Sequence, residues 1–86
     1  MTHTTTTIGI DVSKQYLDAF CRHDQHTVRV PNHSQGIATL LTWIGQRTAR
    51  PLMVIEPTGG YEHTLQAMLL DQGFSLAKVN ARHVRE

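Results

Sequence analysis

Two acidic residues, Asp11 and Glu56, each end a short run of largely apolar residues. Carboxylate oxygens are the ligands that Mg²⁺ and Mn²⁺ prefer, and paired carboxylates form part of the two-metal sites that cleave phosphodiesters. Burying either charge without a partner would cost on the order of several kcal/mol, so each carboxylate would require a cation or hydrogen-bond donors. The alternative is a pair of exposed strand-end acids with no chemical role.

The residues around each acid predict a β-strand. Residues 6–12 are rich in β-branched side chains, and Ile8, Ile10 and Val12 alternate with smaller or polar neighbours. Residues 52–56 form a continuous apolar run that ends in the second acid, which is typical of a strand buried on both faces. Three further strands are expected at residues 16–22, 27–30 and 74–79. The short links between the first three strands favour an antiparallel meander.

A helix is predicted between the third and fourth strands, because four apolar residues recur on one helical face: Ile37, Leu40, Leu41 and Ile44. Ser34 is its expected N-cap, and the helix is expected to end near Arg47. A second helix is expected over residues 61–72, with Gly73 as its C′ residue. A third helix is expected to begin at Ala81.

This order of elements, β-β-β-α-β-α-β, predicts an α/β fold with a mixed five-stranded sheet in spatial order 3-2-1-4-5. The first strand then lies parallel to the fourth, so Asp11 and Glu56 become neighbours at the carboxyl edge, where open α/β sheets bind ligands. Both crossovers step the same way across the sheet, so the right-handed rule places both helices on one face. The other face is left uncovered, and we expect it to cause homo-oligomer formation or poor solubility.

Length and composition indicate one small domain over residues 6–86, preceded by a disordered lead-in at residues 1–5. The net charge of +1 lacks the strong basic excess of many nucleic-acid-binding domains. The single cysteine excludes an internal disulfide and fits a reducing compartment. No apolar run reaches the ~18 residues that span a bilayer, and no hydrophobic signal region is present, which predicts a soluble cytoplasmic protein.

Several other residues are candidates for nucleic-acid contacts. Thr58 and Gly59 precede a predicted helix and could present backbone N–H groups to a phosphate, and Lys14 could reach a phosphate near the metal ions. Three later cations could contact a nucleic-acid backbone: Lys78, Arg82 and Arg85. The alternative is an ordinary tight turn and solvated cations. Three further acids are expected to face water: Asp18, Glu62 and Asp71.

The motifs around the two acids resemble the opening of a transposase family. Residues 8–14 read IGIDVSK, residues 17–18 read LD, residues 56–61 read EPTGGY, and Gly73 and residues 79–80 follow. This combination resembles the DEDD family of insertion-sequence transposases and Piv-type DNA invertases (the IS110 group) over nearly all of the chain. The first domain of that family is similar to RuvC-type Holliday-junction resolvases. The resemblance implies an RNase H-like fold and Mg²⁺-dependent DNA cleavage and strand exchange.

The resemblance assigns Asp11 to the first catalytic acid of the family and Glu56 to the second, both as metal ligands. The other two acids, an Asp pair after the third helix, have no counterpart here, and the C-terminal domain with its serine nucleophile is also missing. We therefore expect an N-terminal piece of a bacterial recombinase, with a two-metal site that residues outside this chain complete and with no cleavage activity of its own. The resemblance also implies DNA and a structured guide RNA as partners.

Two other classes of protein remain open at this point. Actin-like sugar kinases and ATPases also begin with an acid in a first strand followed by a hairpin that wraps ATP phosphates. Their hairpins usually need glycine and a hydroxyl residue directly after the acid, where this chain has Val12-Ser13-Lys14. The third interpretation is a non-catalytic remnant or assembly module that pairs through its bare sheet face. ATP binding would favour the kinase class, and metal binding that is unchanged by Asp11→Asn would favour the assembly module.

Overall fold

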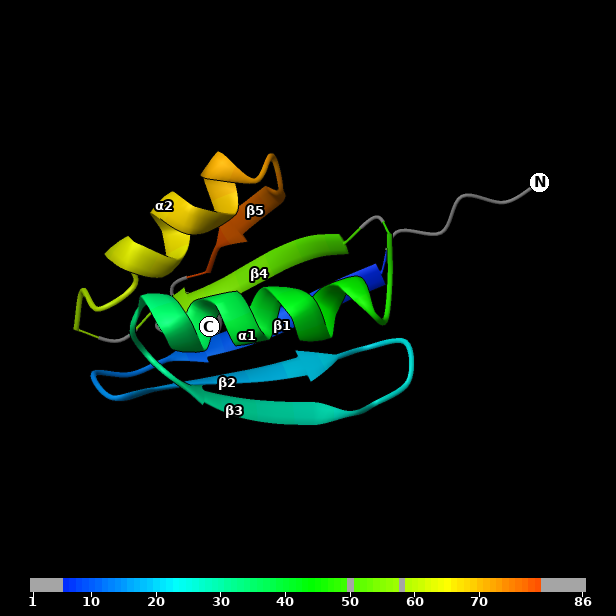
Figure 1. Cartoon of the computed structure of the whole chain (residues 1–86), viewed down its shortest axis with the longest axis horizontal. Helices are drawn as coiled ribbons and strands as arrows, with labels where there is room; N and C mark the ends of the chain where they lie inside the picture. Colours follow the sequence, from blue (N-terminus) through cyan, green and yellow to red (C-terminus); the bar gives the residue numbers. More distant parts are fainter. Residues whose placement is uncertain (1–5, 50, 58, 80–86) are drawn as a thin grey trace, which may run out of the picture.

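The computed structural model describes residues 6–49, 51–57 and 59–79, and these residues form five strands and two helices (Figure 1). The predicted order β-β-β-α-β-α-β is confirmed. In chain order the elements are β1 (Thr6–Val12), β2 (Tyr16–Cys21), β3 (Thr27–Pro31), α1 (Ser34–Gly45), β4 (Pro51–Pro57), α2 (His63–Asp71) and β5 (Ser75–Lys78). The expected lead-in and the expected third helix from Ala81 lie outside the described residues.

The strands of the described residues form one mixed sheet in the predicted order β3-β2-β1-β4-β5. The pairs β1–β2 and β2–β3 are antiparallel, and each is connected by a short turn. The pairs β1–β4 and β4–β5 are parallel, and the chain between the members of each pair contains a helix, as parallel strands require. This is the α/β arrangement of an RNase H-like domain.

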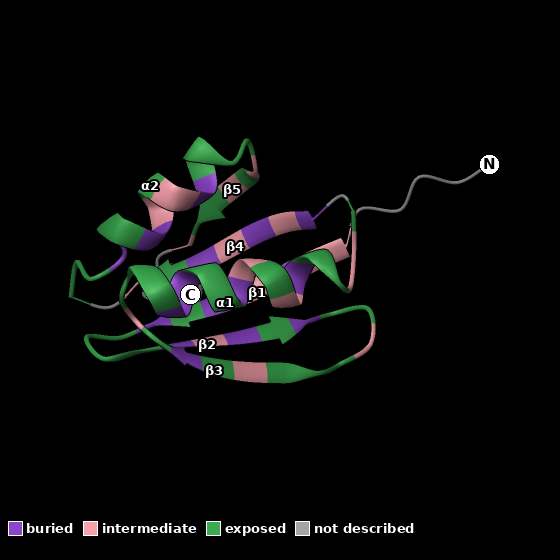
Figure 2. Ribbon diagram, viewed as in Figure 1, coloured by how far each residue is buried: buried purple, intermediate pink, exposed green. Residues whose placement is uncertain are grey.

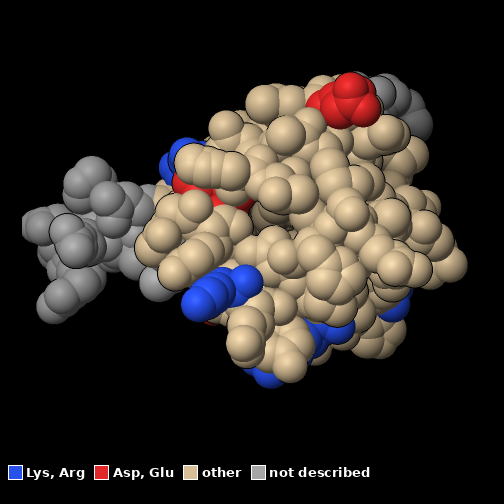
Figure 3. Space-filling view, turned by 60° about the vertical axis from the view of Figure 1, so that its left-hand side comes forward, with Lys and Arg blue, Asp and Glu red and all other residues tan. Residues whose placement is uncertain are grey.

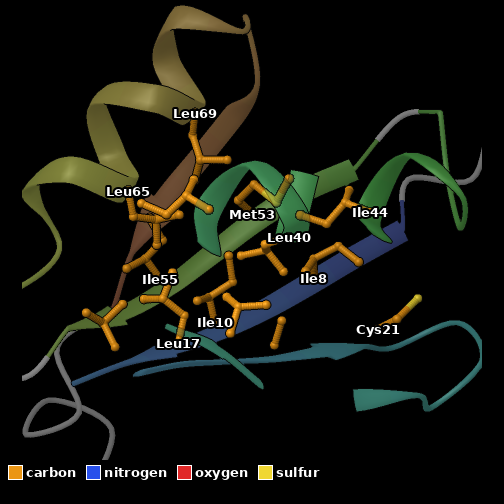
Figure 4. Packing of buried hydrophobic residues seen from close by; sticks show 14 residues of the cluster. Ile8, Ile10, Leu17, Cys21, Leu40, Ile44, Met53, Ile55, Leu65 and Leu69 are labelled. Atoms are coloured by element: carbon orange, nitrogen blue, oxygen red, sulfur yellow. The ribbon is translucent and has the colours of Figure 1, made fainter. Parts of the chain in front are cut away.

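The core lies between the sheet and the two helices, which cover the same face of the sheet (Figure 2). Each helix turns an apolar stripe toward the strands, and alternate strand residues meet it. Fully burying one such side chain favours folding by roughly 1.5–3 kcal/mol. The central side chains of this layer are shown in Figure 4: Ile8 and Ile10 of β1, Met53 and Ile55 of β4, Leu40 and Ile44 of α1, and Leu65 and Leu69 of α2.

The opposite face of the sheet is open in the part of the chain that the structure describes. On β4, Met53 is fully buried against the helices, but Leu52 and Val54 are only partly buried. The prediction that this strand is buried on both faces is therefore wrong for these residues, because both helices lie on one side. Tyr16 and Phe20 of β2 are 41% and 42% exposed on the open side. The open face thus carries aromatic as well as aliphatic surface.

Local hydrogen bonds set the ends of the helices. The N-cap of α1 is His33 rather than Ser34, because the Nδ1 atom of His33 accepts a hydrogen bond from the N–H of Gly36 at 3.3 Å. The helix ends at Gly45, slightly earlier than predicted. Gly73 follows α2 with a φ of 82°, which confirms its predicted place as the C′ residue.

On the face shown in Figure 3, charged side chains are spread thinly among uncharged residues, a blue side chain adjoins a red one at the upper left, and neither sign forms a large continuous patch. This distribution agrees with the small net charge of the sequence, +1. Neither of the described helices combines the length and the apolar character that crossing a membrane requires.

Candidate functional site

The strand ends that carry Asp11 and Glu56 lie side by side. β1 and β4 run parallel, and their register pairs Asp11 directly with Glu56. Alternate residues of a strand point to opposite faces, and the neighbours Ile10 and Ile55 are buried beneath the helices, so both carboxylates belong to the open face. The structure therefore brings together the two acids that the sequence predicts to be neighbours.

A hollow of about 300 Å³ lies on the open face beside these carboxylates. Its lining includes Gly9, Asp11, Asp18, Phe20, Val54 and Glu56. Asp11 and Glu56 are both exposed, so neither incurs the desolvation cost that the sequence suggests for a buried carboxylate. Their oxygens are hard donors open to solvent and fit the ligand preference of Mg²⁺ or Mn²⁺. Among the described residues, no group of three or more His, Cys, Asp or Glu side chains is placed to hold a metal ion.

A third carboxylate, Asp18 of β2, lines the same hollow and is the register partner of Asp11 on the other side of β1. Arg29 of β3 holds it with two hydrogen bonds, from Nε at 2.7 Å and from Nη2 at 3.2 Å. The guanidinium also lies over the ring of Tyr16, 4.6 Å from its centroid. Hydrogen bonding to Asp18 raises the pKa of Arg29 above its ordinary value. No local sequence pattern points to this pair, although the alternation of β2 places Asp18 on the open face.

Lys78 lies on the helix side of the sheet. It pairs in register with the buried Ile55, and its Nζ atom lies 3.1 Å from Oε2 of Glu62. Glu62 is only 6% exposed, so the expectation that it faces water is wrong. Its own backbone N–H and then the Lys78 ammonium lower the pKa of the Glu62 carboxyl, and burial opposes them. Because Lys78 already has a carboxylate partner, a role in nucleic-acid binding stays a prediction.

Two of the remaining predicted contacts, Lys14 and Gly59, lie at the carboxyl edge of the sheet. Gly59 and Gly60 have positive φ angles of 74° and 80° in the exposed loop before α2, a conformation that other residues rarely adopt. Lys14 is exposed in the turn between β1 and β2, at the same edge (Figure 1, left). Three further candidates lie outside the described residues: Thr58, Arg82 and Arg85.

Comparison with known protein families identifies the family of this chain. A family model for the DEDD transposases of the IS110 group matches residues 8–86. The chain belongs to this transposase family. The match spans both acids, β1 from Ile8 onward and every later described element, and it confirms the resemblance seen in the sequence motifs. A comparison with curated proteins gave no match.

Membership in the family makes this chain part of a DNA transposase, and it implies a general dependence on divalent metal ions. It also favours the transposase interpretation of the first strand over the actin-like ATP-binding alternative. Asp11 and Glu56 are the described acids that best fit such chemistry, because they share an edge, a face and a hollow. Asp18 lines the same hollow but is already held by Arg29.

Proposed function

We propose that Asp11 and Glu56 are catalytic metal ligands of a site that cleaves and exchanges DNA strands. One observation carries this proposal: in a chain of the DEDD transposase family, the two acids are register partners and line one hollow on the open face. Their carboxylate oxygens would hold Mg²⁺ or Mn²⁺. Such ions, when bound, stabilise the charge that develops on a reacting phosphodiester.

These two carboxylates are half of the four acids that the family resemblance implies. We expect the other two, an Asp pair after the third helix of the family, to complete a two-metal site. The 86-residue chain alone should therefore bind the cation weakly and should not cleave DNA. Weak cation binding is nonetheless measurable, and it provides a direct test of Asp11 and Glu56.

The nucleic acids that we propose as partners are the DNA substrate and a structured guide RNA, as the resemblance implies. Lys14 and Gly59 are exposed at the edge that carries the carboxylates, which suits contacts with phosphates. Lys78 would have to leave Glu62 to take part. The other proposed contacts are Thr58, Arg82 and Arg85. This function accords with the cytoplasm of a bacterium and with self-association through the open sheet face.

Mn²⁺ binding, measured by isothermal titration calorimetry, tests the proposal. Asp11→Asn and Glu56→Gln keep the size of each side chain but remove its charge, so each should weaken binding by about tenfold or more. Asp71→Asn is the matched control, because Asp71 is exposed on α2 and lies away from the hollow lining. Equal affinity of the unmodified chain and Asp11→Asn would overturn the proposal and favour the non-catalytic assembly module.

A further inference from the structure

The side chain of Asn32 connects the two loops that follow Asp11 and Glu56. Asn32 lies between β3 and α1, and its Nδ2 atom donates two hydrogen bonds. One goes to the carbonyl oxygen of Ser13, in the turn after β1, and the other to the carbonyl oxygen of Tyr61, in the loop after β4, each at 2.9 Å. Both loops lie at the carboxyl edge of the sheet, on the left in Figure 1.

The two hydrogen bonds of the Asn32 amide form a bridge between the loops. This bridge suits asparagine better than chemically similar residues. The amide uses both of its N–H donors, whereas an ionised aspartate of the same shape has none, and serine or threonine has one. Glutamine would place the amide one methylene farther away. The backbone N–H of Asn32 also donates to the carbonyl oxygen of Gln15 at 2.9 Å, which fixes the residue against the β1–β2 turn.

The residues around Asn32 make its turn tight. The N–H of His33 donates to the carbonyl oxygen of Pro31 at 3.0 Å, and His33 then caps α1. A Cβ at Gly36 would fall on the Pro31 carbonyl oxygen, so this glycine allows α1 to begin directly against the end of β3. Asn32 is therefore held between two fixed elements, and its amide is aimed at the carboxyl edge.

The bridge lies close to the point where β1 and β4 stop pairing. Asp11 and Glu56 are each the last residue but one of their strands, and the pair beyond them is Val12 with Pro57. Like charges directly opposite each other destabilise a strand pair, so the two carboxylates weaken this end of the ladder. A tie from outside the sheet would therefore restrain the ends of β1 and β4.

We infer that Asn32 is a positioning residue that ties these two loops together and so sets the separation of the Asp11 and Glu56 carboxylates before a cation binds. The inference rests on the proposed function of the two acids as metal ligands. A pair of ligands that is already ordered binds a cation without the entropy cost of ordering the loops, which raises the affinity.

Asn32→Leu tests the inference, because leucine has a similar shape and no donor. The first measurement is amide hydrogen exchange without metal at Ser13 and Gln66, whose N–H groups bond to the carbonyl oxygens of Tyr16 and Glu62. Both amides should exchange about tenfold faster in the variant, because the hydrogen bonds that restrain the β1–β2 turn and the loop leading into the first turn of α2 are lost. The second measurement is Mn²⁺ affinity, which should fall by about tenfold. Asn32→Ala replaces Asn32→Leu if the leucine variant does not fold.

Asp24→Ala is the matched control. The Asp24 carboxylate accepts hydrogen bonds from the N–H of His26 and from Arg47 near the β2–β3 turn, at the other end of these strands. This variant loses polar contacts of a similar kind without touching either loop. Equal acceleration of both amides in the two variants, or none in Asn32→Leu, would overturn the inference.

The two measurements also separate this inference from the proposed function. Faster exchange in Asn32→Leu with unchanged Mn²⁺ affinity would overturn the positioning role, since the tie would not govern the carboxylates. If Mn²⁺ binding by the unmodified chain does not depend on Asp11, the proposed function fails. The exchange rates at Ser13 and Gln66 then decide alone whether Asn32 couples the two loops.

Discussion

Among the charged side chains of the described residues, Glu62 is one that lies buried from solvent. Its Oε2 atom pairs with Lys78, while Oε1 is buried and has no hydrogen-bond partner among the described residues. The pKa of this carboxyl lies below its ordinary value of 4.5, because its own N–H and the Lys78 ammonium favour the ionised form. The folded chain therefore keeps Glu62 ionised at pH values where the unfolded chain protonates it.

We predict that Glu62→Gln removes a pH-dependent part of the stability. Because the folded pKa is lowered, the contribution of Glu62 is fully present above the unfolded value of 4.5 and is lost as the pH falls through the folded value. The unmodified chain should exceed the variant in free energy of unfolding by more at about pH 6 than at about pH 3. Urea unfolding over this range measures the difference.

Asp71→Asn serves as the control for this experiment, because Asp71 is an exposed carboxylate at the C-terminal end of α2, the helix that Glu62 directly precedes. Asp24 also has a lowered pKa, chiefly because its carboxylate accepts a hydrogen bond from the N–H of His26. Asp24 is present in every protein compared, so its contribution to the pH dependence cancels in the difference. A difference between the unmodified chain and Glu62→Gln that stays constant with pH would contradict the prediction.

The sequence predicts Asp11 and Glu56 as neighbours because strand direction and alternation determine where they lie. The polar partners around them are harder to find, because each pair joins residues far apart in the chain. Asp18 and Arg29 are 11 residues apart, and Glu62 and Lys78 are 16 apart. The Asn32 bridge to Tyr61 spans 29 residues. Strand register and the path of the loops create these contacts, and no local sequence pattern predicts them.

At the scale of the elements, the junction of β3 with α1 depends on Gly36. We predict that Gly36→Ala destabilises the protein by about 1–3 kcal/mol, because the new methyl group would meet the Pro31 carbonyl oxygen and force backbone to move. Thermal or urea unfolding measures this loss. The backbone of Pro31 cannot yield as a flexible side chain would.

Gly45→Ala is the matched control within the same helix. A Cβ at Gly45 would meet nothing within 4 Å, so alanine should be neutral or stabilise the helix by up to about 1 kcal/mol. Equal destabilisation by the two substitutions would show that close packing against Pro31 is not the cause.

The spacing of apolar residues distinguishes strands from helices along the chain, which is why the order of the elements is predictable. The residues at which each element begins and ends are harder to predict. Serine is a common N-cap residue, and the sequence therefore suggests Ser34. The structure has His33 at this position instead, because its ring nitrogen accepts the capping hydrogen bond. The apolar run of β4 suggests burial on both faces, but such a run does not reveal whether a second layer covers the sheet.

At the scale of the whole molecule, the open sheet face predicts self-association. Phe20 is 42% exposed there, beside the partly buried Val54. Phe20→Ser should lower the tendency to associate, because it removes apolar surface from the centre of that face. Sedimentation equilibrium at increasing concentration measures the average mass of the unmodified chain and of the variant.

Leu70→Ser is the control for this prediction. Leu70 is 56% exposed on α2, which covers the helix side of the sheet, so its substitution removes comparable apolar surface from a different face. It should leave the average mass unchanged. A monomeric mass for the unmodified chain at high concentration would contradict the prediction.

The topology is predictable at this scale because short links force antiparallel neighbours and crossovers are right-handed. The first rule gives the antiparallel run β1–β2–β3, and the second gives the side on which both helices lie once β4 is placed beside β1.

The register between β1 and β4 also makes this site sensitive to errors in folding. A slip of one residue along β4 would exchange its two faces, so that Glu56 would enter the core and Ile55 would replace it outside. A chain in the wrong register would thus lose its paired carboxylates and bury an unpaired charge at the same time. Misfolded copies would be both less stable and unable to present the acidic pair, so the strand pairing that assembles this pair also makes its formation depend on correct folding.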